Sequence, residues 1–484
     1  MQFHERINKI KYGLIPVLGL LFLLWYVRSA GADVVYSDYI RIIDDYLPDV
    51  TNLKRLLVPD ILTRIPASFL ARAVNVRSFG LSVTFDRMLT LGGMGLIALT
   101  LYIYMYRHKI GVFWQIVTGV VLFSLNKWEI LLNGTAWAHV VSFGLFFVNY
   151  QLLDLLWTGE ADAKQELLLM LMPFLWLLFA GEYIASYACT MILISLLGIL
   201  TGGANSWAGK GEKGMFCGIL AMTLAALLLY MLSRHFAVWE HAGATEMSLK
   251  DVILTQPWFL PRFFVKTFAG TVLGQETIQA FFPGGGALPD AAVLAAGALV
   301  LGAYVFALVL YFTGDMLEKT VFPLILLVSG LMNHVLVTVG RWIFLSESYA
   351  LSSRYAGQFM IGILGMLLVF ALYCKEHKRV QRRAAQRRKK RLMAAAAAAA
   401  VFIAAGNCYT TYQEIRKAPY REANYENMAA ALLSYSDYTE EDLCRVMEWH
   451  KDPAVLYRAI GILEENRLNV FRMPVFEEAA DNAG

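Results

Sequence analysis

Apolar runs long enough to cross a lipid bilayer recur along most of this chain. The first, residues 12–29, reads YGLIPVLGLLFLLWYVRS, and others follow at intervals up to residue 408. A helix needs about 20 apolar residues to span the hydrocarbon core of a membrane. With 58% hydrophobic and 17% charged residues over 484 positions, the chain has more apolar side chains than a water-soluble core can bury. The sequence therefore predicts an all-α integral membrane protein.

These runs divide the chain into about eleven membrane-crossing helices. Two of them, 166–180 and 183–201, are short and meet at Gly181–Tyr183, so one long tilted helix is the alternative there. That alternative would invert every later crossing. The first run has no small-residue cleavage site near its end, which indicates a retained anchor. The expected spans are 12–29, 88–106, 110–125, 134–157, 166–180, 183–201, 215–233, 291–312, 320–340, 355–374 and 392–408.

Lysine and arginine side chains decide between the two topologies. If 166–201 crosses twice, their clusters all fall on the side of the N-terminus. Cytoplasmic loops carry such an excess, so we expect a multi-pass protein of the inner or plasma membrane with a cytoplasmic N-terminus and a cytoplasmic basic loop at 375–391. That loop favours contact with anionic lipid over nucleic acid. The cations on this side are Arg6, Lys9, Lys11, Arg107, Lys109, Lys164, Lys210, Lys213, Lys319 and those of Lys375–Arg391.

Three long segments then lie on the outer side. The polytopic transmembrane domain covers residues 1–408, with a first outer loop at 30–87 and a second at 234–290. The second loop contains an aromatic stretch typical of an interfacial helix. Residues 409–484 are polar with helical periodicity and form a small helical extracytoplasmic tail, provided that the alanine-rich run 392–408 crosses the membrane.

The first outer loop begins with YSDYIRIIDDYLPDV, which predicts an amphipathic helix. Ser37 occupies the N-cap position, and Pro48 ends the helix. A helix of this kind would lie on the membrane, and a second amphipathic stretch follows at 52–74. The residues that recur on its apolar face are Tyr39, Ile42, Ile43, Tyr46 and Leu47.

Carboxylates and cations lie side by side in this loop, as glycosyl transfer from a lipid phosphate requires. A carboxylate takes the proton of the acceptor hydroxyl, and cations stabilise the departing phosphate. The alternative is structural: Asp38 in a first helical turn would stabilise the helix dipole, and Asp45 would pair with Arg41. The candidate catalytic residues are Asp38, Asp44 and Asp45, and the candidate phosphate ligands are Lys54 and Arg55.

Charged residues at the ends of later spans fall on the same outer side. Such side chains are costly at membrane depth unless they face a cavity or reach the interface. Their convergence with Asp38 predicts one working face, although each taken singly can be a snorkelling anchor. The candidate substrate- or phosphate-binding residues are Glu129, Glu182, Arg341, Arg354 and Tyr355.

An early span, a large outer loop with acids close behind it, amphipathic helices and further spans together resemble the GT-C class of membrane glycosyltransferases. A narrower likeness is to a bacterial family of GT-C-like membrane proteins, mostly of unassigned function. Its members carry an asparagine–acid–histidine–arginine stretch before a proline in the first outer loop. The corresponding NLKRLLVP keeps Asn52, Arg55 and Pro59 but neither the acid nor the histidine. Further matches are Trp128–Glu129, Ser353–Tyr355 and LEENRLNVF at Leu463–Phe471.

This resemblance implies an inverting transferase that moves a sugar from a polyprenyl-phosphate carrier to an envelope glycan or lipid on the outer face. The missing acid shifts the expected base toward Asp38 and its neighbours, or makes the protein a non-catalytic relative. A lipid-linked saccharide flippase and an accessory protein of polysaccharide assembly are the alternatives. No ligand spacing is diagnostic of a metal, so a requirement for Mg²⁺ or Mn²⁺ stays open.

Overall fold

A computed structural model describes residues 2–53, 66–204, 213–233, 244–282, 286–375 and 383–472. Within these ranges the chain forms helices and no strands, so the prediction of an all-α protein is confirmed. The α-helices are α1 (Gln2–Ala30), α2 (Asp38–Tyr46), α3 (Pro66–Phe79), α4 (Val83–Arg107), α5 (Val112–Leu122), α6 (Trp128–Leu132), α7 (Trp137–Thr158), α8 (Ala163–Trp176), α9 (Ile184–Thr201), α10 (Lys213–Ser233), α11 (Leu249–Thr255), α12 (Phe259–Ala269), α13 (Gln275–Phe281), α14 (Ala287–Thr313), α15 (Phe322–Arg341), α16 (Ser353–Lys375), α17 (Arg383–Leu433), α18 (Glu440–Val446) and α19 (Pro453–Glu465).

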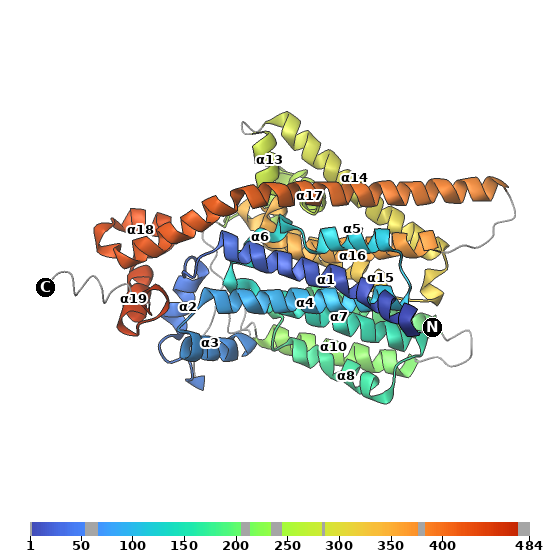
Figure 1. The fold of residues 1–484 in the computed structure, drawn as a ribbon, viewed down its shortest axis with the longest axis horizontal. Coiled ribbons are helices and arrows are strands. Elements are labelled where there is room, and N and C mark those ends of the chain that lie inside the picture. Colours follow the sequence, from blue (N-terminus) through green and yellow to red (C-terminus); the bar gives the residue numbers. More distant parts are fainter. Residues whose placement is uncertain are drawn as a thin grey trace.

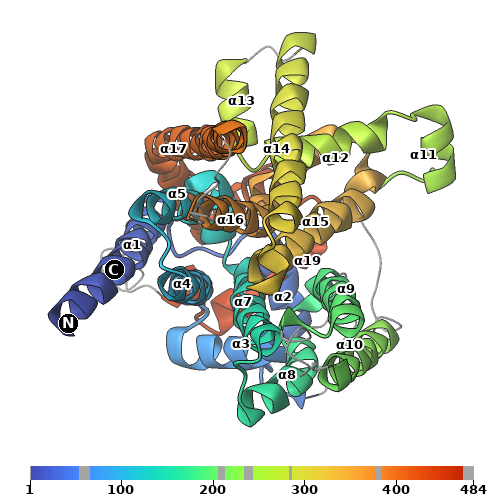
Figure 2. The same cartoon turned by 90° about the vertical axis from the view of Figure 1, so that its right-hand side faces the viewer.

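Ten segments of the described chain are long and apolar enough to cross a membrane. The count differs from the expected eleven because α8 covers only 14 residues. α8 and α9 are separate helices joined through the 3₁₀ helix η4 (Gly181–Tyr183), so the single long helix over 166–201 does not form (Figure 2). The ten segments are Tyr12–Ala30, Val83–Arg107, Val112–Leu132, Gly134–Thr158, Ile184–Thr201, Lys213–Ser233, Ala287–Thr313, Phe322–Phe344, Ser353–Lys375 and Gln386–Leu433.

The long helices run roughly along one axis, with α16 at the centre of the bundle (Figure 1). The most apolar window of α16 is 89% buried, whereas that of α17 is 22% buried and leaves most of its surface for lipid. α15 approaches α16 closely at Gly330, where an added Cβ atom would clash with the Cα atom of Gly362. Close backbone contact of this kind drives helix association in a bilayer, where the hydrophobic effect cannot.

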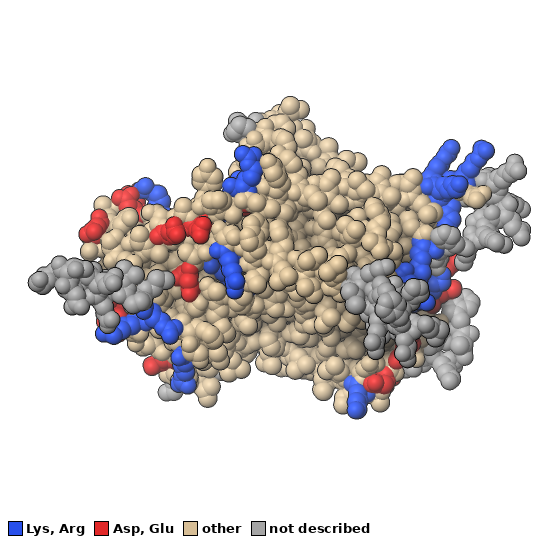
Figure 3. Space-filling view, in the orientation of Figure 1, with Lys and Arg blue, Asp and Glu red and all other residues tan. Residues whose placement is uncertain are grey.

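The two ends of the bundle carry different elements. The N-terminus and the first turns of α17, with Arg387–Arg391, lie at one end, here called the basic end. The helices α2, α3, α18 and α19 lie at the other, here called the tail end (Figure 1). On the face that Figure 3 shows, charged side chains gather at both ends and leave a largely uncharged band between them. That band is the surface that a lipid bilayer would surround.

The C-terminal tail is a continuation of the bundle. α17 is one helix of 51 residues that runs from the basic end to the tail end, so the expected boundary between residues 408 and 409 falls inside it. α18 and α19 form where the sequence predicts helices, and Thr439 caps α18. The amphipathic α2 forms as predicted, and Tyr39, Ile40, Ile43 and Tyr46 are buried against protein, including α19, so these side chains are not available to a membrane.

Asn469 connects the tail by hydrogen bonds to both ends of the segment 30–87. Its Oδ1 atom accepts a hydrogen bond from the N–H of Val35 (3.1 Å), and its Nδ2 atom donates to the carbonyl of Leu81 (2.9 Å). Its backbone N–H donates to the carbonyl of Gly80 (2.8 Å). Asn469 has a φ of 51°, a conformation that asparagine tolerates better than most residues. Asn469 of the LEENRLNVF motif therefore has a structural role.

Candidate functional site

Asp38 begins α2 at a point that the tail holds in place. Ser37 has a φ of 50° and its side chain makes no capping bond, so the side-chain cap expected there is wrong. The N–H of Ser37 instead donates to the carbonyl of Met447 in the tail, 3.0 Å away. Tyr39 is buried and donates its hydroxyl to Asp86 (2.7 Å), whereas Asp38 remains partly exposed. The tail and the start of α4 thus fix the orientation of α2.

Glu129 and Arg354 form an ion pair across 225 positions of sequence. The Nη2 and Nε atoms of Arg354 lie 2.7 and 2.8 Å from one carboxylate oxygen of Glu129, and Ser353 donates to the other oxygen (3.1 Å). The Arg354 side chain is 47% exposed. Because only part of its fork is engaged, this guanidinium can bind a further anion. The two motifs read separately in the sequence are therefore in contact.

Two further carboxylates lie within electrostatic range of this ion pair. Asp38 from α2 lies within electrostatic range of Arg354, and Glu448 from the tail lies within range of both members of the pair. No described residue donates a hydrogen bond to the carboxylate of Asp38. We call Asp38, Glu129, Arg354 and Glu448 the open cluster. It joins the first outer loop, two span ends and the tail.

Glu448 is a member of this cluster that the sequence did not reveal. Desolvation, and then the nearby charge of Glu129, raise the pKa of Glu448 above its ordinary value of 4.5, while Arg354 opposes the shift. Glu448 has a φ of 53°, so it belongs to no regular helix and no periodicity marks it. Only the fold shows that the segment after α18 returns to the start of α16.

The other two aspartates of α2 have partners of their own. Asp44 makes a bidentate pair with Arg458 of α19, with nitrogen–oxygen distances of 2.9 and 2.8 Å. Asp45 lies 3.9 Å from Arg41, the pairing considered from the sequence. The structure thus brings Asp38 toward Arg354 and leaves Asp44 at the contact between α2 and the tail.

The remaining candidates divide into two groups. Arg341 lies over the ring of Tyr355 at 5.5 Å, and Tyr355 is buried against Phe263 and Phe359 on the side of α12. Arg341 and Tyr355 therefore share the tail end but belong to a different packing cluster from Glu129. Lys54, Arg55 and the side chain of Glu182 lie outside the described residues.

A second group of charges at the tail end is fully paired. Arg262 of α12 donates to Glu347 (2.8 Å) and to Asp290 of α14 (2.7 Å), and Lys266 contacts both of these carboxylates. Burial would raise the pKa of Glu347, but hydrogen bonds from Arg262 and Lys266 outweigh it and the pKa is lowered. We call these four residues the closed network. It connects α12, which lies across the bundle in Figure 2, to α14 and to the segment before α16.

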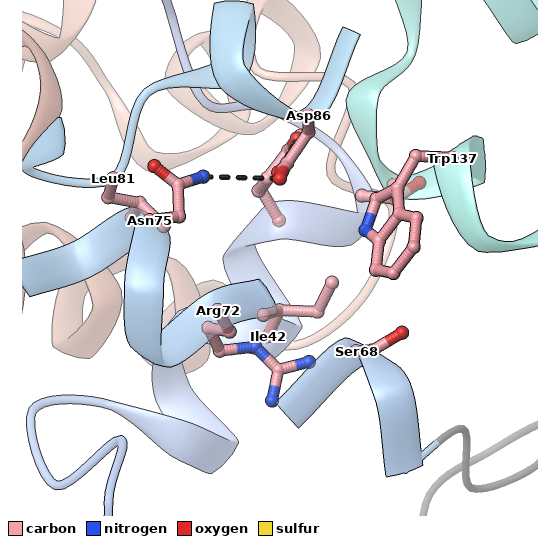
Figure 4. A pocket seen from close by; sticks show the side chains of 9 residues that line it. Ile42, Ser68, Arg72, Asn75, Leu81, Asp86 and Trp137 are labelled. Carbon is pink, nitrogen blue, oxygen red and sulfur yellow. Dashed lines mark hydrogen bonds between the residues drawn. The ribbon is translucent and has the colours of Figure 1, made fainter. Parts of the chain in front are cut away.

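A pocket lies beside α2, on the side of Tyr39. Asp86 is 8% exposed there and accepts hydrogen bonds from the hydroxyl of Tyr39 and from Nδ2 of Asn75 (3.2 Å). Figure 4 shows that Arg72 from α3 and the indole of Trp137 from α7 project toward the same space. The sequence reading missed Asp86 because α4 begins at Val83, five positions before the expected span at 88. The sequence feature that could have identified Asp86 is an acidic residue in the first turn of a helix capped by Ser82.

Three buried charges inside the bundle serve helix ends. Asp154 accepts hydrogen bonds from the N–H groups of Val321 and Phe322 at the start of α15. Lys127 donates to the carbonyl of Ser124 after α5, and Arg87 donates to the carbonyl of Leu132 at the end of α6. Each sign is the one that the helix dipole favours at that end. These charges therefore have a structural explanation.

Within the described residues, no three histidine, cysteine, aspartate or glutamate side chains come together as a metal site. At the tail end, Asp38 can supply a carboxylate base and Arg354 a guanidinium within electrostatic range of it. No protein-family model, no curated protein and no solved structure matches this chain.

Proposed function

We propose that this protein is a GT-C-type membrane glycosyltransferase that moves a sugar from a polyprenyl-phosphate carrier to an envelope glycan or lipid acceptor. The observation that supports the proposal best is the open cluster. It places a carboxylate without a hydrogen-bond donor among the described residues, Asp38, near a guanidinium that Glu129 orients. The base and the phosphate ligand must both lie at the membrane surface, because the polyprenyl tail of such a donor stays in the bilayer.

In the proposed reaction, Asp38 accepts the proton of the acceptor hydroxyl while the hydroxyl oxygen attacks the anomeric carbon. The new carbon–oxygen bond forms as the bond from that carbon to the phosphate oxygen breaks, and the configuration inverts. The released polyprenyl phosphate keeps the bonding electrons, and Arg354 stabilises its added negative charge. A positioned base of this kind accelerates a reaction by about 10²–10⁴-fold.

Glu129 and Glu448 have supporting roles in this scheme. Glu129 fixes two nitrogens of Arg354, so that the guanidinium is oriented before substrate binds. Glu448 shares the field of Arg354 and contributes a further carboxylate that can accept hydrogen bonds from sugar hydroxyls. The sequence-derived roles of Asp44, Asp45 and Arg341 remain predictions.

The test uses purified protein in lipid nanodiscs, supplied with radiolabelled polyprenyl-phosphate sugars and a membrane extract as acceptor source. Asp38→Asn is expected to lower the turnover number about 10²-fold or more, because the amide cannot take the proton. Asp45→Asn, on the same helix but paired locally with Arg41, separates the two candidate bases: if Asp38 is the base, this variant should keep at least half of the activity. Full activity of Asp38→Asn would remove Asp38 from the mechanism.

The same purified protein, in nanodiscs or reconstituted into vesicles, separates the alternatives. Wild-type protein that transfers no sugar from any of these donors, yet co-purifies with a polysaccharide-assembly protein, would support the accessory role. A flippase would move a fluorescent lipid-linked saccharide across a vesicle without transfer. The buried charges Asp154, Lys127 and Arg87 give transport little support, because each binds a helix end rather than facing a path.

A further inference from the structure

We infer that exposed aromatic side chains near the tail end lie in the headgroup layer of the bilayer, and that the open cluster opens at the same level. Trp258 and Tyr412 are 73% and 54% exposed, so their rings are available to lipid. This placement does not depend on the proposed function. The residues concerned, here called the aromatic belt, are Trp258, Phe281, Phe282, Tyr349 and Tyr412.

The aromatic belt draws its members from different sides of the bundle. Trp258 precedes α12, Phe281 and Phe282 end α13, and Tyr412 lies on α17. Figure 2 shows α13 and α17 on one side of the bundle and α12, with α11, on another. A protein partner covers one side of such a bundle, whereas a bilayer surrounds it. Lipid is therefore the partner that can contact all of these side chains together.

α12 sets the aromatic belt at one level, because it lies across the bundle rather than along it (Figure 2). Near its start, Arg262 donates to Glu347 of the 3₁₀ helix η9 (Glu347–Leu351), which also contains Tyr349. Just after its end, the carbonyl of Thr271 accepts a hydrogen bond from Nδ2 of Asn407 on α17, 2.9 Å away. The two ends of α12 thus connect η9 and the middle of α17 at a similar height.

The sequence of α17 changes from apolar to polar at this level. Residues 392–408 contain no charged side chain, whereas 413–422 contain five. Between these segments, the ring of Tyr409 packs against Phe281 and Tyr412, with centroid distances of 5.1 and 6.4 Å. Tyr412 lies about 31 Å along the helix from Arg391, the last cation of the basic segment 375–391. That length matches the hydrocarbon core of a bilayer, which is about 30 Å thick.

α16 has the same length between its charged ends, and it places the open cluster at the aromatic belt. Arg354 is its second residue and Lys375 its last, about 32 Å apart along the axis. Tyr349 precedes Arg354 by five positions. Near the basic end, Phe113 in the first turn of α5 and Phe312 in the last turn of α14 are also exposed. Aromatic side chains gather at both surfaces of a bilayer, so Arg354 lies at the level of the lipid phosphates.

The experiment measures the depth of single spin labels in vesicles of phosphatidylcholine with one-fifth phosphatidylglycerol. The native cysteines are replaced by alanine, and a nitroxide is attached at Trp258→Cys, Tyr349→Cys or Tyr412→Cys. EPR power saturation gives the collision rates of the label with oxygen and with a water-soluble nickel complex, and the ratio of these rates increases with depth. Leu299→Cys, on α14 and 63% exposed, is the control for the hydrocarbon core. Glu441→Cys, 90% exposed in the tail, is the control for water.

We expect the three labels in the aromatic belt to agree within about two-fold in this ratio. Their ratios should be at least about three-fold below that of Leu299 and at least about two-fold above that of Glu441. Ratios equal to either control would overturn the inference. Spin–spin broadening between molecules would also overturn it, because a second copy would then cover the aromatic belt. A ratio at Tyr349 unlike those at Trp258 and Tyr412 would remove the open cluster from the membrane surface.

A second measurement leaves the native cysteines in place. Trp258→Phe keeps an aromatic ring but removes one indole, so the difference in fluorescence between wild type and variant reports on Trp258 alone. Phosphatidylcholine brominated near the headgroup should quench this difference at least about two-fold more than phosphatidylcholine brominated near the end of the acyl chain. Equal quenching, or none, would contradict the placement of Trp258. Neither measurement requires sugar transfer, so a failure of the proposed function leaves the result unchanged.

Discussion

The closed network and the open cluster are built from the same kinds of side chain at the same end of the bundle, but they differ in completeness. In the closed network, two cations meet two carboxylates, and both cations contact both carboxylates. In the open cluster, three carboxylates lie within electrostatic range of Arg354, with Arg421 and His450 acting on Glu448 as well, and Asp38 has no hydrogen-bond donor among the described residues. Balanced charge holds helices together, whereas unbalanced charge leaves capacity for a ligand.

The difference shows why a charge at the end of a membrane helix cannot be assigned from its type alone. Arg262 and Arg354 both lie near the tail end, and both bind carboxylates. Arg262 uses its nitrogens on two partners from different elements, which is a structural arrangement. Arg354 has one ionic partner in direct contact among the described residues and a 47% exposed side chain, so it can bind substrate without leaving a carboxylate unpaired.

The largest expected effect is on activity and comes from the open cluster. Arg354→Ala removes the guanidinium that would stabilise the leaving phosphate, and we expect turnover to fall about 10²–10³-fold. The measurement is sugar transfer in nanodiscs, with Arg262→Ala as the matched arginine deletion in the closed network. Loss of activity in Arg262→Ala as large as in Arg354→Ala would break the distinction between the two groups.

The tail is expected to have the next largest effect, because it brings Glu448 to the open cluster. Asn469→Ala leaves the N–H of Val35 and the carbonyl of Leu81 without their partner, at a cost of about 2 kcal/mol. Hydrogen exchange of residues 440–470 should become faster, and transfer should fall with it. Unchanged exchange in this variant would show that α17 alone holds the tail in place.

Arg262→Ala should act on stability rather than on activity. It leaves Asp290 and Glu347 with Lys266 as their remaining cation, and the expected loss of unfolding free energy is about 1–2 kcal/mol because Arg262 is 36% exposed. Thermal unfolding followed by tryptophan fluorescence measures it. A fall in melting temperature no greater than that of an exposed lysine-to-alanine control would contradict the structural role.

The smallest effect is a dependence on pH. Since the folded pKa of Glu448 is raised, its contribution to stability is present below the ordinary pKa of 4.5 and is lost as pH rises through the folded pKa. Glu448→Gln should therefore be more stable than wild type at pH 8, by less than about 1 kcal/mol, and equal to it near pH 4. A constant difference across this range would show that the pKa of Glu448 is not raised in the folded protein.

Local features of the fold could be predicted from the sequence, and long-range ones could not. Periodicity indicated α2 and α19, and the matching motifs at Glu129 and Arg354 indicated a common end, because each signal lies within one turn or one span. Nothing local shows that Glu448 reaches the start of α16, or that Arg341 faces Tyr355 rather than Arg354. Asp86 was missed because the edge of a span is set by a capping serine, not by hydropathy.

The clasp between Val35 and Asn469 joins residues 434 positions apart, and this has a consequence for assembly in the cell. The segment that carries Asp38 leaves the ribosome early, but the backbone groups that fix it find their partners only after every span between them has been inserted. Until then, the N–H of Val35 and the carbonyl of Leu81 lack the partner that Asn469 supplies. The candidate site can therefore form only once the whole polypeptide has been made. An unfinished chain contains Asp38 but not the tail residues that hold the start of α2 in place.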